Sequence, residues 1–372
     1  MTDTDLIFMK RAIQLAQLGL YTTRPNPRVG CVLVKNGEII AEGWHHKAGS
    51  PHAERVALTI AGNQAQRSTA YVSLEPCCHY GRTSPCSEAL IAAGLVRVVA
   101  AMRDPNPQVQ GKGLEQLATA GIAVTCGILE TQAAALNPGF IKRMTTGLPW
   151  VRCKLAMSLD GRTAPANGER QTITSETARR DVQFLRARSD AIITGVGTIL
   201  ADDPALTVRL SAKELEIEQV INVPFQPMRV ILDTNLRTPP TAKILKQVGN
   251  TFILHSSNDF SLITNLQIAR AKLQFIPKVN GRLDMKAALQ FLAQLEMNEV
   301  LIEAGHIVAG AAIEAGIVDE LIIYLAPQLM GNAALGLVQL PTTNGGRNPL
   351  SLTIKDIQAI GNDWRITAQP TK

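Results

Sequence analysis

Hydrophobic and polar positions change period along the chain, and the changes predict short helices that alternate with short strands. Apolar residues recur at helical spacing over residues 4–18, and Asn36-Gly37 between two apolar runs is a strong hairpin signal. The expected strands of the first half are 29–34, 39–43, 70–74, 96–101 and 122–126, and its further helices are 52–61, 85–93, 112–120 and 130–145. This alternation predicts an α/β three-layer sandwich.

The second half repeats the alternation after a polar turn at residues 145–149, so we expect domains of residues 1–147 and 148–372. Expected strands are 150–157, 190–194, 229–232, 251–255 and 300–303, and expected helices are 175–188 and 284–296. The last strand leads into Ala304-Gly305 and a helical pattern, where backbone N–H groups can receive phosphate. The glycine spacing there is not the full dinucleotide fingerprint, and tight packing explains the small residues equally well.

The amino-acid composition limits the kinds of molecule that this protein is expected to bind. The net charge is +6 and the pI about 9.1, which suits an anionic partner. Aromatic residues make up only 4%, which is poor material for stacking single-stranded bases, so we expect a small phosphorylated substrate and no nucleic acid. No apolar run approaches the roughly 20 residues of a membrane span, and the six scattered cysteines are typical of reduced thiols and metal ligands. We therefore expect a cytoplasmic protein without membrane contact.

A motif in two parts contains the candidate metal ligands and the candidate catalytic residue. His52-Ala53-Glu54 is followed by Pro76-Cys77 and then by Cys86. Catalytic zinc usually takes three protein ligands, here His52, Cys77 and Cys86, and leaves a position for water. A Glu two residues after the histidine is the proton shuttle of zinc deaminases and not a ligand. The motif therefore predicts Zn²⁺-dependent deamination with Glu54 as the catalytic acid and base.

The spacing of the cysteines leaves an alternative open. The usual deaminase motif ends Pro-Cys-x-x-Cys, whereas eight residues separate Cys77 from Cys86 here. A closed structural site with Cys78 or His79 as fourth ligand is the rival interpretation. It would make the protein a non-enzymatic nucleotide binder. A nucleic-acid deaminase of the tRNA-editing type is a further rival, since it shares the zinc motif and the positive charge.

The longer motifs resemble one enzyme family over nearly the whole chain. Residues 25–30, 43–49, 51–54, 74–86, 104–107 and 111–113 resemble the deaminase domain of the bifunctional deaminase/reductase family of riboflavin biosynthesis, whose own cysteine spacing is the long one. Residues 154–163, 181–186, 194–209 and 303–310 resemble its reductase domain. The resemblance implies a cytidine-deaminase-like domain followed by a dihydrofolate-reductase-like α/β domain that uses NADPH.

The resemblance also implies site residues. Those expected to hold the pyrimidine and its ribose phosphate in the deaminase are Asn26, His45, Arg82, Asp104 and Asn106. Expected NADPH contacts are Ala156, Thr172, Thr198, Asp202, Gly305, His306 and Ile307. Expected substrate contacts of the reductase are Lys154, Arg170, Arg186, Leu206, Arg209 and Glu303.

Departures from the family pattern concentrate near the expected cofactor. The family often has Gly-Glu-Ser-x-Trp where this chain has Gly168-Glu169-Arg170-Gln171-Thr172, and Gly-Pro is replaced by Gly305-His306.

The expected function is deamination of a phosphoribosylated diaminopyrimidinone, followed by NADPH-dependent reduction of its ribosyl to a ribityl chain. Since soluble metabolic enzymes are commonly symmetric oligomers, we expect a homodimer.

Overall fold

The computed structural model describes residues 3–80, 84–166, 171–340 and 349–371, and the chain divides into two compact units. The first unit is Met1–Gly147 with Ser211–Pro224, and the second is Leu148–Leu210 with Phe225–Lys372. A short segment from the second half of the sequence is thus grouped with the first unit. No helix among the described residues is long and apolar enough to cross a membrane.

The first unit is built on a five-stranded sheet of order β2-β1-β3-β4-β5. Strand β1 is antiparallel to β2 and β3, and β3, β4 and β5 run parallel. The strands are β1 (Gly30–Lys35), β2 (Glu38–Trp44), β3 (Thr69–Val72), β4 (Arg97–Ala100) and β5 (Ala123–Cys126). The helices are α1 (Asp3–Gln17), α2 (Ala53–Ala61), the 3-10 turn η1 (Gly62–Ala65), α3 (Cys86–Ala92), α4 (Lys112–Thr119), α5 (Glu130–Leu136) and α6 (Pro138–Thr146).

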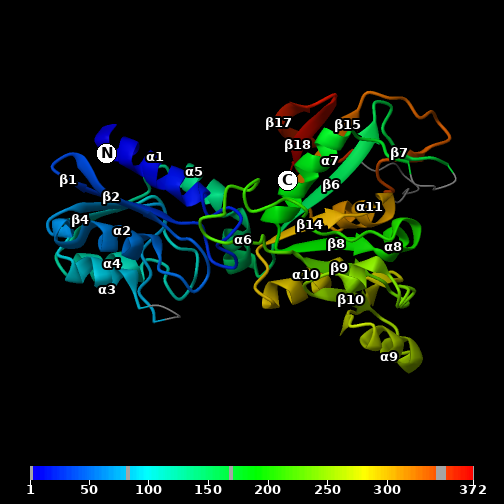
Figure 1. Ribbon diagram of the computed structural model, residues 1–372, viewed down its shortest axis with the longest axis horizontal. Helices are drawn as coiled ribbons and strands as arrows, with labels where there is room; N and C mark the ends of the chain where they lie inside the picture. The colour runs from blue at the N-terminus through cyan, green and yellow to red at the C-terminus, as the bar shows by residue number, and fades with distance from the viewer. Residues whose placement is uncertain (1–2, 81–83, 167–170, 341–348, 372) are drawn as a thin grey trace. The chain divides into compact units, whose positions relative to one another are not determined.

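Both faces of this sheet are covered, as the continuous apolar run of β1 requires. Val32 belongs to the core cluster that includes Met9 of α1, whereas Leu33 on the opposite face belongs to the cluster that includes Ala57 of α2 and Leu117 of α4. Figure 1 shows α1 on one side of the sheet and α2, α3 and α4 on the other. The prediction of a three-layer α/β sandwich is confirmed.

The single helix expected over residues 130–145 is wrong, because the chain breaks between α5 and α6 at Asn137. The Asn137 side chain accepts from the backbone N–H of Arg28 at 2.8 Å and donates to its carbonyl at 2.9 Å. Pro138 follows and has no N–H to continue the helix. The break therefore anchors the loop around Arg28 through a contact that lies 109 residues away in sequence.

The second unit is built on a nine-stranded sheet of order β11-β10-β9-β8-β14-β6-β15-β18-β17. All neighbours from β11 to β15 run parallel, and β18 and β17 form an antiparallel hairpin at the edge. Its strands are β6 (Trp150–Ser158), β8 (Ala191–Gly195), β9 (Met228–Leu232), β10 (Thr251–His255), β11 (Lys272–Phe275), β14 (Glu299–Glu303), β15 (Glu320–Ala326), β17 (Leu352–Ile360) and β18 (Asp363–Pro370).

Helices and small strands complete the second unit. The helices are α7 (Glu176–Arg188), α8 (Val196–Asp202), the 3-10 turn η2 (Lys243–Lys246), α9 (Phe260–Ile268), α10 (Met285–Gln294) and α11 (His306–Glu314). Two small ribbons are formed by β12 (Lys278–Val279) with β13 (Arg282–Leu283) and by β7 (Arg162–Ala164) with β16 (Leu335–Gly336).

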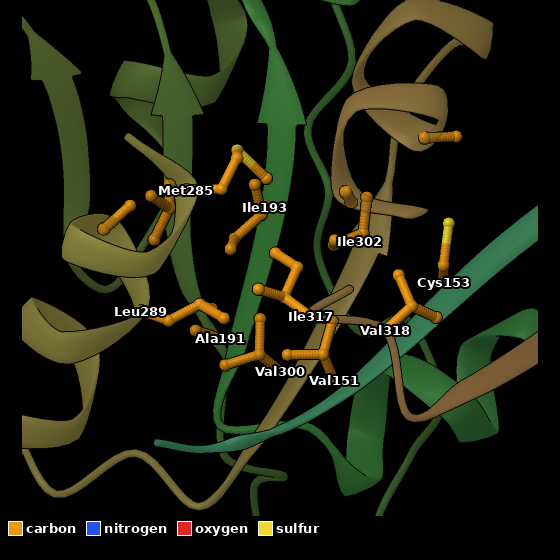
Figure 2. Packing of buried hydrophobic residues seen from close by; sticks show 14 of the residues in the cluster. Val151, Cys153, Ala191, Ile193, Met285, Leu289, Val300, Ile302, Ile317 and Val318 are labelled. Atoms are coloured by element: carbon orange, nitrogen blue, oxygen red, sulfur yellow. The ribbon is translucent and has the colours of Figure 1, made fainter. Parts of the chain in front are cut away.

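The central strands of this sheet are buried on both faces. In Figure 2, Ile193 of β8, Val300 and Ile302 of β14 and Leu289 of α10 lie in one core cluster. Leu301, between the two β14 residues, belongs instead to the cluster that includes Leu185 of α7. Because the strands are parallel, their carboxyl ends meet at one edge of the sheet, where α/β proteins bind ligands.

Candidate active sites

Three side chains of the first unit converge on one point. The Nδ1 atom of His52 lies 3.6 Å from Sγ of Cys77 and 3.3 Å from Sγ of Cys86, and the three ligand atoms lie within 4.8 Å of one another. A tetrahedral zinc with the usual bond lengths to sulfur and nitrogen separates two such atoms by about 3.5 Å. The spacing and the donor types therefore fit zinc.

Local structure explains why these residues meet. His52 is the N-cap residue just before α2 and Cys86 is the first residue of α3, while Cys77 follows β3 in a loop. The loop is tied to α3 because the Cys77 carbonyl accepts from Ser87 N at 3.1 Å and from Ser87 Oγ at 3.0 Å. Two helix N-termini and a strand end thus gather the donors.

The protonation of this group favours a metal site. A hydrogen bond from Cys86 lowers the pKa of the Cys77 thiol, and His52 contributes in the same direction. Glu54 is 3% exposed, and this burial raises the pKa of its carboxyl, although the neighbouring His52 opposes the shift. A buried carboxyl with a raised pKa binds a proton more readily than an exposed one, which suits a group that accepts and returns protons.

The closed four-ligand alternative finds no support among the described residues. The group of potential ligands there consists of His52, Cys77 and Cys86 and includes neither Cys78 nor His79. Three protein donors therefore gather here, as in catalytic zinc sites.

Two residues expected to hold the substrate lie beside this group. The His45 ring stands edge-on to the His52 ring at 5.2 Å between centroids. Since the Pro51 carbonyl can only accept, His45 Nδ1 carries the proton at 3.1 Å from it, and Nε2 accepts from Nδ2 of Asn26 at 3.0 Å. Burial lowers the pKa of His45 to about 4, so this ring is neutral.

Asp104 and Asn106 follow β4 on the loop before α4. Asp104 is 7% exposed, and burial raises the pKa of its carboxyl to about 7. Its Oδ1 accepts from Asn106 N at 2.8 Å. Arg82 lies outside the described residues.

A cluster of charged side chains gathers in the second unit. Lys154 of β6 is the register partner of Glu303 of β14. Arg186 of α7 donates to both carboxylate oxygens of Glu303, at 2.8 and 2.6 Å. Burial raises the pKa of Glu303, but Arg186, Lys154 and Arg209 outweigh it, so the net pKa is lowered. Three of the expected substrate contacts therefore surround the carboxylate of a fourth, Glu303.

The other expected residues of the second unit have mixed positions. Thr198 and Asp202 lie on α8 after β8, and Gly305 is the N-cap residue of α11 after β14. Because β8 and β14 are neighbours, the two helices start at the same edge of the sheet. A Cβ on Gly195 would lie 2.7 Å from Val308, so α8 and α11 approach closely there. Ala156 lies on β6 and Leu206 is buried, Thr172 is exposed, and Arg170 lies outside the described residues.

Two observations at this edge fit NADPH. Gly305 provides α11 with no side-chain cap, which leaves its first N–H groups for a phosphate. Thr194 Oγ1, at the end of β8, is fully buried and has no hydrogen-bond partner among the described residues. Orphaned buried hydroxyls call for a partner, and a bound cofactor can supply one.

The sequence analysis did not identify the aromatic side chain that lies against Lys154. The Lys154 ammonium lies 5.8 Å from the ring centroid of Tyr324 on β15. The Tyr324 hydroxyl donates to Asp181, whose carboxylate also accepts from Arg365 at 2.9 Å. The apolar run Glu320–Ala326 could have predicted a buried strand, but no local pattern identifies its tyrosine as a neighbour of Lys154.

Comparisons with known proteins agree with this division of chemistry. Residues 2–102 match the cytidine and deoxycytidylate deaminase zinc-binding region, and residues 149–366 match the RibD C-terminal domain. Riboflavin biosynthesis protein RibD of Escherichia coli is 48% identical over 96% of this chain and 97% of its own. RibD of Haemophilus influenzae is 48% identical over 99% of this chain and 98% of its own.

Solved structures extend the likeness to the whole fold. Form 1 of Acinetobacter baumannii RibD has a TM-score of 0.90 at 45% identity, and each chain is covered to 99%. A Thermotoga maritima diaminohydroxyphosphoribosylaminopyrimidine deaminase/5-amino-6-(5-phosphoribosylamino)uracil reductase has a TM-score of 0.84 at 30% identity, again over 99% of each chain. The chain belongs to the RibD family and is a bifunctional enzyme of riboflavin biosynthesis, a zinc-dependent deaminase and an NADPH-dependent reductase.

Proposed function

We propose that residues 1–147 deaminate 2,5-diamino-6-(5-phosphoribosylamino)pyrimidin-4-one and that residues 148–372 then reduce its ribosyl chain to ribityl. The observation that carries the first assignment is the convergence of His52, Cys77 and Cys86 beside the buried Glu54. The second rests on the charged cluster around Glu303.

His52, Cys77 and Cys86 would hold the zinc, which when bound would supply the Lewis acidity that makes water a stronger nucleophile at neutral pH. Glu54 takes a proton from the attacking water and delivers it to the departing amino nitrogen. The C–N bond breaks, a C–O bond replaces it, and ammonia leaves. The raised pKa of Glu54 supports this role, because a shuttle must both accept and release the proton.

Asn26 and His45 orient the pyrimidine. Since Asn26 Nδ2 donates to His45 Nε2, the Oδ1 of Asn26 remains to accept from an N–H group of the substrate. His45 keeps this orientation as long as its Nδ1 proton is held by the Pro51 carbonyl. Asp104, Asn106 and Arg82 complete the contacts to the ring and the ribose phosphate.

In the second unit, NADPH when bound would supply the hydride that reduces the ring-opened ribose. The residues that would hold the cofactor are Ala156, Thr172, Thr198, Asp202, Gly305, His306 and Ile307. Lys154, Arg186, Arg209, Arg170, Leu206 and Glu303 bind the substrate, and the cations attract its phosphate. The bidentate contact with Arg186 keeps Glu303 ionised and fixed in orientation.

A coupled assay tests the assignment. NADPH oxidation is followed by absorbance with the diaminopyrimidinone as the only substrate, and ammonia is assayed in parallel. Both signals are expected, and ammonia should appear first. NADPH loss without ammonia would contradict the order of the two steps.

We propose further that the protein is a cytoplasmic homodimer that binds no nucleic acid. All six cysteines are free, which supports a reducing compartment. Ile354 and Ile357 are exposed on β17, the last strand of the sheet, which supports pairing with a second copy. Light scattering should give the mass of two chains, and a tRNA gel shift should show no complex.

A further inference from the structure

The Glu75 carboxylate, two residues before Cys77, is buried at 3% exposure and is saturated with backbone donors. Its Oε2 accepts from Asp104 N at 3.0 Å and Gly111 N at 2.9 Å. Its Oε1 accepts from Gly113 N at 3.0 Å and Leu114 N at 3.3 Å. One side chain thus ties the whole loop from Asp104 to the first turn of α4 to the segment that carries Cys77.

A close backbone approach fixes the same two segments independently. A Cβ atom on Gly113 would lie 2.0 Å from the carbonyl oxygen of Pro76, the residue between Glu75 and Cys77. No real Cβ is found at such a distance, so only glycine allows α4 to begin there. The Asp104–α4 segment is therefore clamped both by the carboxylate and by direct backbone contact.

The chemistry of the clamp demands a carboxylate. Four N–H groups point at its two oxygens, and an ionised carboxyl is a pure acceptor. An amide of the same shape would turn an NH₂ group toward two of these N–H donors and leave them buried without a partner, which destabilises the loop.

We propose that Glu75 is a positioning residue for deamination, which sets Asp104 at its working distance from the metal ligand Cys77. It touches neither substrate nor metal in this assignment and acts through the Asp104 backbone. The inference rests on the proposed function of the first unit, in which Asp104 contacts the substrate.

The variant E75Q tests this in the full-length zinc enzyme. The KM for deamination should rise about tenfold, more than kcat falls, because a misplaced binding contact weakens substrate affinity. Zinc content should stay at its wild-type stoichiometry. NADPH-dependent reduction of the already deaminated substrate should be unchanged and reports that the second unit is folded, while the retained zinc reports on the fold of the first unit.

A matched control is D5N, which alters another buried carboxylate of the first unit. Asp5 is 2% exposed and bonds Tyr71 and Arg97. Its loss should lower the unfolding temperature without moving the KM for deamination. A KM shift in D5N equal to that in E75Q would show a general structural effect and overturn the proposal.

A double variant tests whether Glu75 affects deamination through Asp104. In D104A, a further E75Q change should leave KM where D104A alone puts it, because the contact that Glu75 positions is already gone. If E75Q and D104A raised KM independently, so that the two increases multiplied, the proposal would be overturned. An unchanged KM in E75Q, or a loss of zinc from E75Q with no change in KM, would overturn it as well. If E75Q also loses reduction, E75D is judged by the same KM criterion. A fully active E54Q would instead refute the proposed function itself.

Discussion

The two sites of this enzyme are assembled in opposite ways. The metal centre draws its donors from residues 52 to 86, and helix starts and a strand end bring them together within one stretch of chain. The charged cluster joins Lys154, Arg186 and Glu303 from β6, α7 and β14, and the parallel register of β6 and β14 sets it. The first can be recognised as a spacing motif, whereas the second depends on the topology of the sheet.

The largest expected effect breaks the first site while sparing the second. E54Q removes the proposed proton shuttle but keeps the shape of the side chain, so deamination should fall about 1,000-fold, within the range for general acid–base catalysis. Zinc content and NADPH-dependent reduction should be unchanged. The matched control E42Q changes a glutamate that pairs with Arg11 at the surface and should leave ammonia release intact. Normal deamination by E54Q would refute the mechanism.

In the second site, we expect the loss of one charged partner to reduce both stability and activity. R186A leaves the carboxylate of Glu303, 17% exposed in its side chain, without its bidentate partner. Removing one partner of a buried pair costs about 3 kcal/mol, so denaturant unfolding of the second unit should shift and reduction should be lost.

An exposed ion pair provides the control for R186A. Arg11 and Glu42 are 44% and 30% exposed in their side chains, so R11A should cost less than about 1 kcal/mol. Equal losses in R11A and R186A would contradict the importance of burial at Glu303. Deamination by R186A should persist, which keeps the two sites separable.

A smaller change tests the support of Lys154. Y324F keeps the ring under the ammonium but removes the hydroxyl that donates to Asp181. The loss should be about 1 kcal/mol in unfolding free energy, because Arg365 still satisfies Asp181. The KM of reduction should change little, whereas Y324L, which removes the aromatic face, should raise it. Identical KM values for the two variants would rule out a role of the ring.

The same contrast explains what the sequence could predict. Residues 52–86 gave the donor set by local spacing, and the alternation of apolar runs gave the α/β layers, which are confirmed. The break at Asn137 could not be predicted, because its partner Arg28 is 109 residues away. The four donors to Glu75 lie 29 to 39 residues downstream and are backbone groups, which no side-chain pattern reveals. The final strands β15, β17 and β18 were likewise not expected from the pattern.

The last expected effect is a pH dependence of stability that arises from Asp104. Burial raises the pKa of its carboxyl from 3.8 to about 7 in the folded chain. The folded state therefore holds a proton that the unfolded chain has released, so the contribution of this group to stability falls as pH rises from 4 to 7. D104N removes the titration, and the unfolding temperature of the variant relative to wild type should increase between pH 5 and pH 8. The surface variant E42Q should show no such trend, because Arg11 lowers the pKa of Glu42. A constant difference between D104N and wild type across this range would mean that Asp104 is ionised throughout. Its carboxylate would then only accept hydrogen bonds from the substrate. The hydrogen bond from the Asn106 N–H would have to offset the effect of burial on the pKa of Asp104.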